Sequence, residues 1–201
     1  MFTIDQIRTA LARVPNDPAK YAPHPRHAAV SMIFSGPPGA LEVCFIRRAE
    51  RAGDPWSGQV AFPGGRASPA DPDAPSVAER ETWEEIGLTL APRHRVGPLP
   101  MRAVETNSLR AGLTLWPFVY HVGAEERAIA MPRLPLEVAS VFWVPIDHLF
   151  DEGAVTEYEY PGLTASVFPG IQFGEHVIWG LTLRVLASFA EVMQRRLPAL
   201  A

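Results

Sequence analysis

The most constraining feature of this sequence is the stretch AERETWEEIGL, residues 78–88, in which three glutamates lie within five positions. Ser76 precedes the stretch and belongs to a residue type that caps helix N-termini, whereas Gly87 is suited to the left-handed conformation that ends many helices. The pattern therefore predicts a helix from Ser76 to Ile86. A Pro-Gly-Gly turn at residues 63–65 comes shortly before it.

The three glutamates share one face of this predicted helix. At about 100° per residue, Glu84, Glu81 and Glu85 lie at about −60°, 0° and +40° around the axis. Like-charge neighbours at these spacings repel one another by about 0.2–0.5 kcal/mol per pair when exposed, and more in a pocket. Arg80, four residues before Glu84, can fix one carboxylate. Because hard divalent cations bind oxygen ligands, we favour a metal site here over a solvated acidic face.

The rest of the chain alternates strand-like and helical segments. Residues 28–34 and 41–48 are typical of two strands of a hairpin. Further strands are expected at 59–62, 96–103, 113–122, 137–146, 155–160, 165–169 and 176–180. Pro117 predicts that the strand at 113–122 lies at a sheet edge or contains a bulge. Because strands and helices are interleaved without a linker, residues 1–201 are expected to form a single mixed-sheet α/β domain.

Three further helices are expected, a short one at residues 146–150 and one near each end of the chain. Apolar residues recur at helical spacing over about residues 3–14 and again over about 181–197.

On the carboxylate helix predicted above, Thr82, Trp83 and Ile86 lie opposite the glutamates. These three side chains are therefore expected to bury against a sheet.

Composition narrows the classes of function. The formal net charge is −4 and no basic stripe is visible, which argues against general nucleic-acid binding. We find no apolar run of about eighteen residues and no signal-peptide pattern, so we expect no membrane span and a cytoplasmic location. Cys44 is the single cysteine, which rules out a disulfide within the chain and predicts a small buried hydrophobe.

The stretch RETWEEIGL at residues 80–88 resembles the Nudix box, in which a glycine and a spaced acidic residue precede Arg-Glu-apolar-x-Glu-Glu-x-Gly-apolar. The matching positions are Gly65, Arg80, Glu81, Glu84, Glu85, Gly87 and Leu88. Two departures are visible. Asp71 replaces the spaced glutamate, with eight rather than seven residues between it and Arg80, and Thr82 stands where an aliphatic residue is commoner.

This resemblance implies a Nudix-type α/β/α sandwich with a mixed central β-sheet, and hydrolysis of a diphosphate linked to another moiety. The implied ligands of Mg²⁺ or Mn²⁺ are Glu81, Glu84, Glu85 and the carbonyl of Gly64. Arg80 is expected to orient Glu84 or a neighbour. Glu137 lies where many Nudix proteins place an extra carboxylate, as base or metal ligand, and the alternative is a solvent-facing loop glutamate.

Two flanking segments resemble the coenzyme A pyrophosphatase branch of the family. They are SGQVAFPGGR at residues 57–66 and VIWGLT at residues 177–182. That branch carries an arginine four residues before Gly58, where this chain has Asp54. The candidate substrate-binding residues are Arg47, Arg48, Arg51 and Arg66, whose forked guanidinium groups match phosphate oxygens, and Gln59 as a polar contact.

These features support three hypotheses. The first is hydrolysis of coenzyme A or acyl-CoA to 3′-phosphoadenosine 5′-phosphate and a phosphopantetheine. The second keeps the chemistry but changes the substrate to ADP-ribose, a dinucleotide or a nucleoside triphosphate, and the missing arginine favours it. The third is a non-catalytic nucleotide-binding module, which the intact glutamate cluster disfavours. The apolar, proline-containing segment at residues 160–170 is a candidate homodimer contact.

Overall fold

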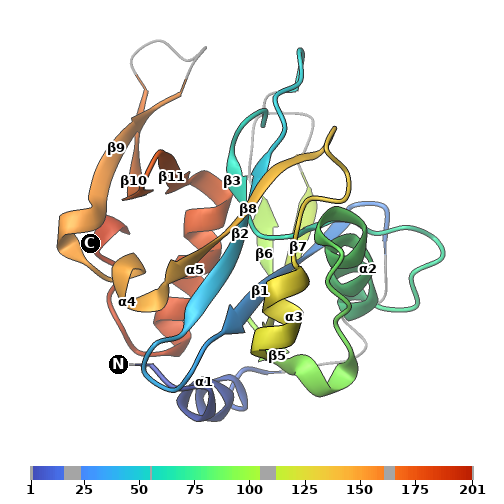
Figure 1. Cartoon of the computed structure of the whole chain (residues 1–201), viewed down its shortest axis with the longest axis horizontal. Helices are drawn as coiled ribbons and strands as arrows, with labels where there is room; N and C mark the ends of the chain where they lie inside the picture. The colour runs from blue at the N-terminus through green and yellow to red at the C-terminus, as the bar shows by residue number, and fades with distance from the viewer. Residues whose placement is uncertain (1, 16–23, 55, 105–111, 161–165, 201) are drawn as a thin grey trace.

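A mixed β-sheet runs through the centre of the structure, a computed structural model that describes residues 2–15, 24–54, 56–104, 112–160 and 166–200 (Figure 1). Its strands are β1 (His27–Ser35), β2 (Glu42–Arg48), β3 (Val60–Ala61), β4 (Gly64–Arg66), β5 (Arg95–Pro98), β6 (Arg102–Val104), β7 (Leu113–His121) and β8 (Val138–Pro145). The strand β1 is buried along most of its length, which explains its nearly continuous apolar sequence.

The central strand β1 organises the sheet. It pairs in parallel with β7 on one side, and on the other side it pairs antiparallel with β2 near one end and β4 near the other. The main strand order is β3-β2-β1-β7-β5, with β8 on β2 and β6 on β7. The predicted antiparallel pairing of the first two strands is confirmed.

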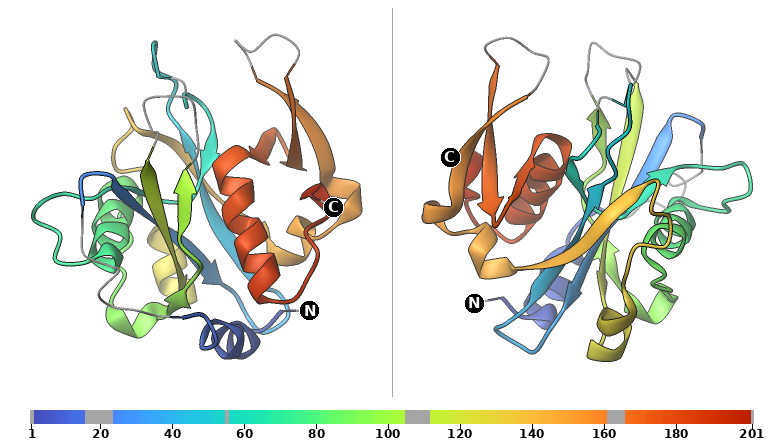
Figure 2. Two further views of the ribbon diagram at one scale, coloured as in Figure 1. Left: turned by 180° about the vertical axis from the view of Figure 1, so that it is seen from behind. Right: turned by 45° about the horizontal axis from the view of Figure 1, so that its top comes forward.

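Helices cover both faces of this sheet, as Figure 2 shows. They are α1 (Ile4–Leu11), α2 (Ala74–Ile86), α3 (Ala124–Ile129), α4 (Ile146–Leu149) and α5 (Gly180–Val192), with 3-10 turns η2 (Pro92–His94), η3 (Glu152–Ala154) and η4 (Pro198–Leu200). Val77 and Ile86 of α2 belong to one hydrophobic cluster, whereas Leu186 and Phe189 of α5 belong to a second cluster on the other face. The predicted helix–sheet–helix architecture is confirmed.

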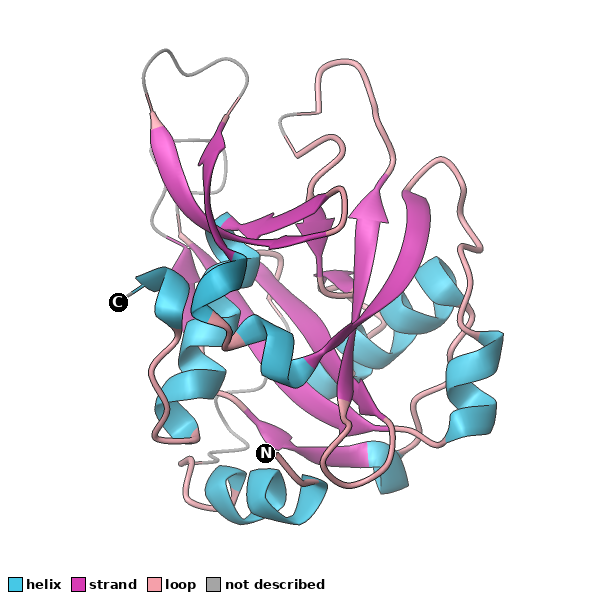
Figure 3. Cartoon of the chain, turned by 60° about the vertical axis from the view of Figure 1, so that its left-hand side comes forward, coloured by secondary structure: helices cyan, strands magenta, loops and turns pink. Residues whose placement is uncertain are grey.

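A small antiparallel sheet lies beside α5 (Figures 1 and 3). Its strands are β9 (Val155–Glu159), β10 (Val167–Phe173) and β11 (His176–Trp179), in the order β11-β10-β9. The three strands predicted in this region are confirmed, and β11 leads directly into α5. Of the segment proposed as a dimer contact, residues 161–165 lie outside the described residues.

The carboxylate helix differs from its prediction in two respects. It begins at Ala74 rather than after Ser76, because the Asp73 side chain is the N-cap and accepts a hydrogen bond from the Ser76 backbone N–H at 2.8 Å. Trp83 is 48% exposed rather than buried, and the guanidinium carbon of Arg133 lies 4.1 Å from its ring centroid. This cation–π contact lets a large aromatic residue stay at the surface.

The two outer helices are shorter than predicted. The first is confined to Ile4–Leu11, where Thr3 and Gln6 form a capping box at its start. The second covers Gly180–Val192, and shortly after its end Gln194 has a φ of 53°, a left-handed conformation that a helix cannot continue through.

Pro117 predicted either an edge strand or a bulge, and the edge interpretation is wrong. The strand β7 is internal, paired with β1 on one side and with β5 and β6 on the other. A bulge is present but lies in the chain that faces β7 and not in β7 itself, because Pro98 pairs with Phe118 whereas Arg102 pairs with Leu115, so the facing chain contains one extra residue. Pro117 lies opposite this break, where its missing N–H is tolerated.

Two predictions from composition can be compared with the described residues. Cys44 is fully buried on β2, as expected, and burial raises the pKa of its thiol. Within the described ranges, no helix combines the length and apolar character needed to cross a membrane.

Candidate active site

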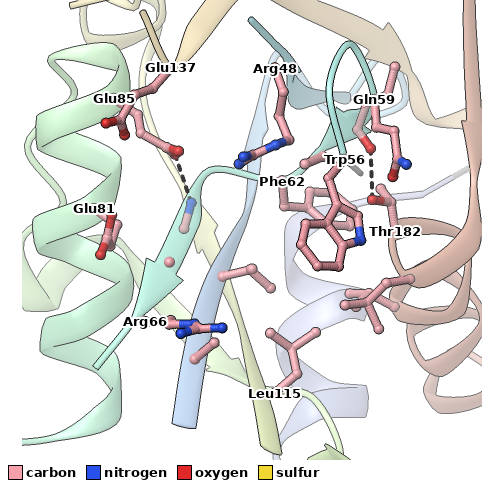
Figure 4. A pocket seen from close by; sticks show the side chains of 18 of the residues that line it. Arg48, Trp56, Gln59, Phe62, Arg66, Glu81, Glu85, Leu115, Glu137 and Thr182 are labelled. Atoms are coloured by element: carbon pink, nitrogen blue, oxygen red, sulfur yellow. Dashed lines mark hydrogen bonds between the residues drawn. The ribbon is translucent and has the colours of Figure 1, made fainter. Parts of the chain in front are cut away.

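Two glycines on β4 let the glutamates of α2 approach the sheet closely. A Cβ on Gly65 would lie only 2.4 Å from Cδ of Glu81, and a Cβ on Gly64 would lie 2.3 Å from the carbonyl oxygen of Ala29. The φ of Gly64 is +150°, which disfavours any side chain. Its N–H donates to Oε2 of Glu85 at 2.9 Å (Figure 4). The glycine pair therefore forms a side-chain-free gap that two carboxylates occupy.

Arg80 connects the remaining carboxylates of the motif. Its Nε and Nη2 donate to the two carboxylate oxygens of Asp71 at 2.8 and 3.0 Å. Its Nη1 donates to Glu81 at 3.0 Å and to Glu84 at 3.1 Å, so the predicted contact with Glu84 is confirmed. Asp71 is buried, and its hydrogen bonds with Arg80 lower the pKa of its carboxyl group. The sequence placed Asp71 in the motif, but it did not predict that this residue anchors Arg80.

The site has more negative charge than its arginine neutralises. Burial raises the pKa of Glu85 to about 8, despite the hydrogen bond from Gly64, and the nearby charge of Glu81 adds to this effect. Burial also raises the pKa of Glu81, against the opposing effect of Arg80. Both shifts mean that the ionised carboxylates lack sufficient positive charge around them.

These groups border a cavity of about 290 Å³, the active-site cavity (Figure 4). The predicted site residues that line it are Arg48, Gln59, Gly64, Gly65, Arg66, Glu81, Glu85 and Glu137. Other predicted site residues within the described ranges do not line the cavity, among them Glu84, Arg47 and Arg51. Arg47 instead pairs with Glu50 at 2.9 Å, and Arg51 lies 3.7 Å from Glu137.

Asp54, which stands in place of the expected arginine, contacts two residues that line this cavity. Asp54 accepts a hydrogen bond from Nη2 of Arg48 through its Oδ2 at 2.9 Å, and another from the Trp56 backbone N–H through its Oδ1 at 2.9 Å. Both Arg48 and Trp56 line the cavity. The positive charge of Arg48 also counters the elevated pKa of Glu85. Asp54, in the loop that follows β2, thus fixes the arginine at the end of that strand.

Thr82, the other departure from the motif, is also accounted for. It is fully buried on the face of α2 that packs against the sheet. There its hydroxyl donates to the Ala78 carbonyl at 2.7 Å and lies 2.9 Å from the hydroxyl of Ser31. A buried hydroxyl is tolerated when it is hydrogen-bonded. Ser31 on β1 is the partner that makes a polar residue acceptable here.

The carboxylates fit a hard divalent cation. No three His, Cys, Asp or Glu side chains in the described part of the chain form a ready-made metal cluster. However, Glu81 and Glu84 each place one oxygen on Arg80, and Glu85 places one on Gly64, so each carboxylate retains a second oxygen. Oxygen donors with an excess of buried negative charge are the chemistry that Mg²⁺ and similar ions require.

Comparison with known proteins identifies the family. Residues 25–161 match the family model described as NUDIX domain, and the chain belongs to the Nudix family. It is accordingly an enzyme of the Nudix diphosphate hydrolase type, a class that generally uses divalent metals.

Individual relatives agree with this assignment. The chain is 31% identical over 179 residues to human "Mitochondrial coenzyme A diphosphatase NUDT8", covering 86% of this chain and 71% of that protein. It is 29% identical over 190 residues to "Uncharacterized Nudix hydrolase NudL" from Photorhabdus laumondii, covering 90% and 92%. A crystal structure of a MutT/nudix family protein from Enterococcus faecalis superposes with a TM-score of 0.59 at 13% identity, covering 95% of this chain and 74% of that one, which shows the shared fold.

The raised pKa of Glu85 predicts how stability depends on pH. The folded pKa of about 8 exceeds the unfolded value of about 4.3, so protonated Glu85 stabilises the metal-free fold at low pH and this stabilisation is lost as the pH rises through about 8. Glu85→Gln stays neutral throughout. Thermal melts in chelator are expected to show that the variant gains stability over the parent from about pH 4.3 to about pH 8, and that the gain then levels off. Glu84→Gln controls for removing one charge from α2, and a difference in Tm that is constant across this range would contradict the account.

The contact between Asp54 and Arg48 predicts an effect on substrate affinity. Asp54→Ala releases the guanidinium, so KM for the diphosphate substrate is expected to rise about tenfold, with a smaller change in kcat, as for a lost hydrogen bond to a charged group. Asp54→Asn retains acceptor capacity and is expected to have a milder effect. Steady-state kinetics measure both. Glu50→Ala is the matched control, because it removes the partner of Arg47, which does not line the cavity; an equal rise in KM for both alanine variants would refute the role of Asp54.

Proposed function

We propose that this protein hydrolyses the diphosphate of coenzyme A or acyl-CoA to 3′-phosphoadenosine 5′-phosphate and (acyl-)phosphopantetheine. The observation that carries the proposal is a pair of carboxylates, half-buried Glu81 and buried Glu85, at a glycine gap in a cavity that also presents Arg48 and Arg66. The choice of substrate is supported by the similarity to the human protein named as a coenzyme A diphosphatase.

In the proposed reaction, the oxygen of a water molecule forms a bond to one phosphorus. The bond from that phosphorus to the bridging oxygen breaks, and the second phosphate leaves with the electron pair. The water proton passes to Glu137, a carboxylate that lines the cavity and is not among the proposed metal ligands. A carboxylate placed beside the reacting water serves as a general base.

The other carboxylates and the arginines are proposed to bind the metal ion and the phosphate groups. The residues proposed to hold Mg²⁺ or Mn²⁺ are Glu81, Glu84, Glu85 and the carbonyl of Gly64. Such a cation, when bound, neutralises phosphate charge and lowers the pKa of coordinated water. Arg80 keeps Glu81 and Glu84 in place through Nη1. Arg48 and Arg66 are proposed to donate hydrogen bonds to the phosphate oxygens, for which a guanidinium group is geometrically suited.

A second candidate keeps this chemistry but changes the substrate to another diphosphate, such as ADP-ribose. The observation that favours it is Asp54, which occupies the place of an arginine expected in enzymes that cleave coenzyme A. The two candidates differ only in the group attached to the diphosphate.

Substrate profiling tests the proposal. The purified protein is incubated with Mg²⁺ or Mn²⁺ and a panel of coenzyme A, acetyl-CoA, ADP-ribose, dinucleotides and nucleoside triphosphates. Coenzyme A or its acyl form is expected to give the highest kcat/KM. Glu84→Gln and Glu85→Gln are each expected to lower kcat by about 10²-fold or more, the scale typical of losing one electrostatic contribution in an active site.

The control variant is Glu125→Gln, on exposed α3 and outside the cavity lining. Circular dichroism verifies that each variant is folded. A preference for ADP-ribose would transfer the assignment to the second candidate. Near-full metal-dependent activity in folded Glu85→Gln would overturn the placement of the site.

A further inference from the structure

The active-site cavity contains an apolar compartment that the hydrolytic chemistry does not use. It consists of six side chains. Its floor is formed by Ala28 of β1 and by Leu113 and Leu115 of β7, its side by Val60 of β3, and its roof by Leu181 and Val185 of α5. In Figure 4, Leu115 lies apart from Glu81 and Glu85, which are on the α2 side of the cavity.

The strand register places this compartment at a defined separation from the glycine gap. Ala28 pairs with Arg66 of β4 on one side and with Leu115 of β7 on the other. Since neighbouring strands lie about 4.8 Å apart, Leu115 is about 10 Å across the sheet from Arg66. A diphosphate held beside β4 therefore has one of its two substituents directed over the apolar floor.

The size of the cavity limits what enters it. Its volume of about 290 Å³ is at the low end for small-molecule sites, so it holds one end of a coenzyme-sized substrate rather than the whole molecule. The two ends of coenzyme A differ in chemistry. One is a purine nucleotide with polar ring edges and a further phosphate. The other begins with a methylene and a saturated carbon that bears two methyl groups, followed by a hydroxyl-bearing carbon and two amides.

The lining matches the second of these ends. Its six members are all aliphatic, whereas the arginines of the cavity, Arg48 and Arg66, lie outside this group, so the compartment suits branched saturated carbon better than a phosphorylated nucleotide. The hydroxyl of Thr182, at the same cavity, donates to the Val60 carbonyl at 2.9 Å and so ties α5 to β3 as a fixed roof. Gln59 lies beside this contact in Figure 4, within reach of the amide-bearing part of such an arm.

We infer that the apolar compartment binds the pantetheine side of the substrate, with its dimethyl carbon against Leu115 and Leu181. The nucleotide side then extends from the opposite end of the diphosphate, outside the compartment. This inference rests on the proposed function and makes Leu181 a specificity-determining residue.

Inhibition by the two reaction products tests the inference. 4′-Phosphopantetheine and 3′-phosphoadenosine 5′-phosphate are each titrated against coenzyme A hydrolysis by the parent, Leu181→Gln and Leu136→Gln. Leu181 is only partly buried, so glutamine of similar length is compatible with the start of α5. We expect Leu181→Gln to weaken inhibition by 4′-phosphopantetheine about tenfold, as for a lost apolar contact in a pocket, with less than about a twofold effect on the nucleotide product.

Leu136→Gln makes the same chemical change at a side chain that is 77% exposed and outside the cavity lining, and it is expected to affect neither product. If Leu181→Gln fails to fold, Leu181→Trp decides the matter, because the larger ring fills the compartment and should likewise weaken phosphopantetheine binding selectively.

Weakened inhibition by the nucleotide product alone, or by both products equally, would overturn the inference while coenzyme A hydrolysis stands. Hydrolysis of another diphosphate with no cleavage of coenzyme A would instead overturn the proposed function, and the inference with it.

Discussion

The site depends on one close approach, that of two glutamates from α2 to the glycine pair on β4. The carboxylate of Glu81 occupies the space that a Cβ on Gly65 would need, and Glu85 accepts a hydrogen bond from Gly64. The helix lies on one face of the sheet, whereas the cavity extends towards α5 on the other. A side chain at Gly64 or Gly65 would clash with Ala29 or Glu81 and push the carboxylates away from the cavity. The anchoring of β4 to β1 and of α2 to the core maintains that contact.

Electrostatics gives this arrangement its chemical character. Arg80 is shared among Asp71, Glu81 and Glu84, which holds the carboxylates in fixed positions but leaves Glu85 with little compensation. Burial therefore raises the pKa of Glu85 to about 8. A cation entering the cavity would restore the ionised form of this carboxylate. The repulsion among the glutamates that the sequence predicts is thus present in the folded protein. A cation that binds between these carboxylates would relieve it and stabilise the site.

Local patterns predicted much of this. Helical spacing alone placed Glu84 within reach of Arg80, and strand patterns identified most elements of both sheets. The strand β4 was missed, because Pro-Gly-Gly is typical of a turn, and the single strand expected at 96–103 is divided between β5 and β6. The errors have physical causes. Both Asp73 and Ser76 are good capping residues, so composition could not choose between them. The exposure of Trp83 depends on Arg133, fifty positions away. The hydrogen bonds of Asp54 could likewise not be predicted from the sequence, because they depend on how the loop after β2 folds back on that strand.

The most direct test of the central claim is to locate the cation. Crystals grown with Mn²⁺ would be examined by anomalous diffraction at the manganese absorption edge. The account predicts an anomalous peak between the carboxylates of Glu81 and Glu85, next to the backbone of Gly64. A manganese peak elsewhere in the cavity, or none at a Mn²⁺ concentration that supports hydrolysis, would contradict it.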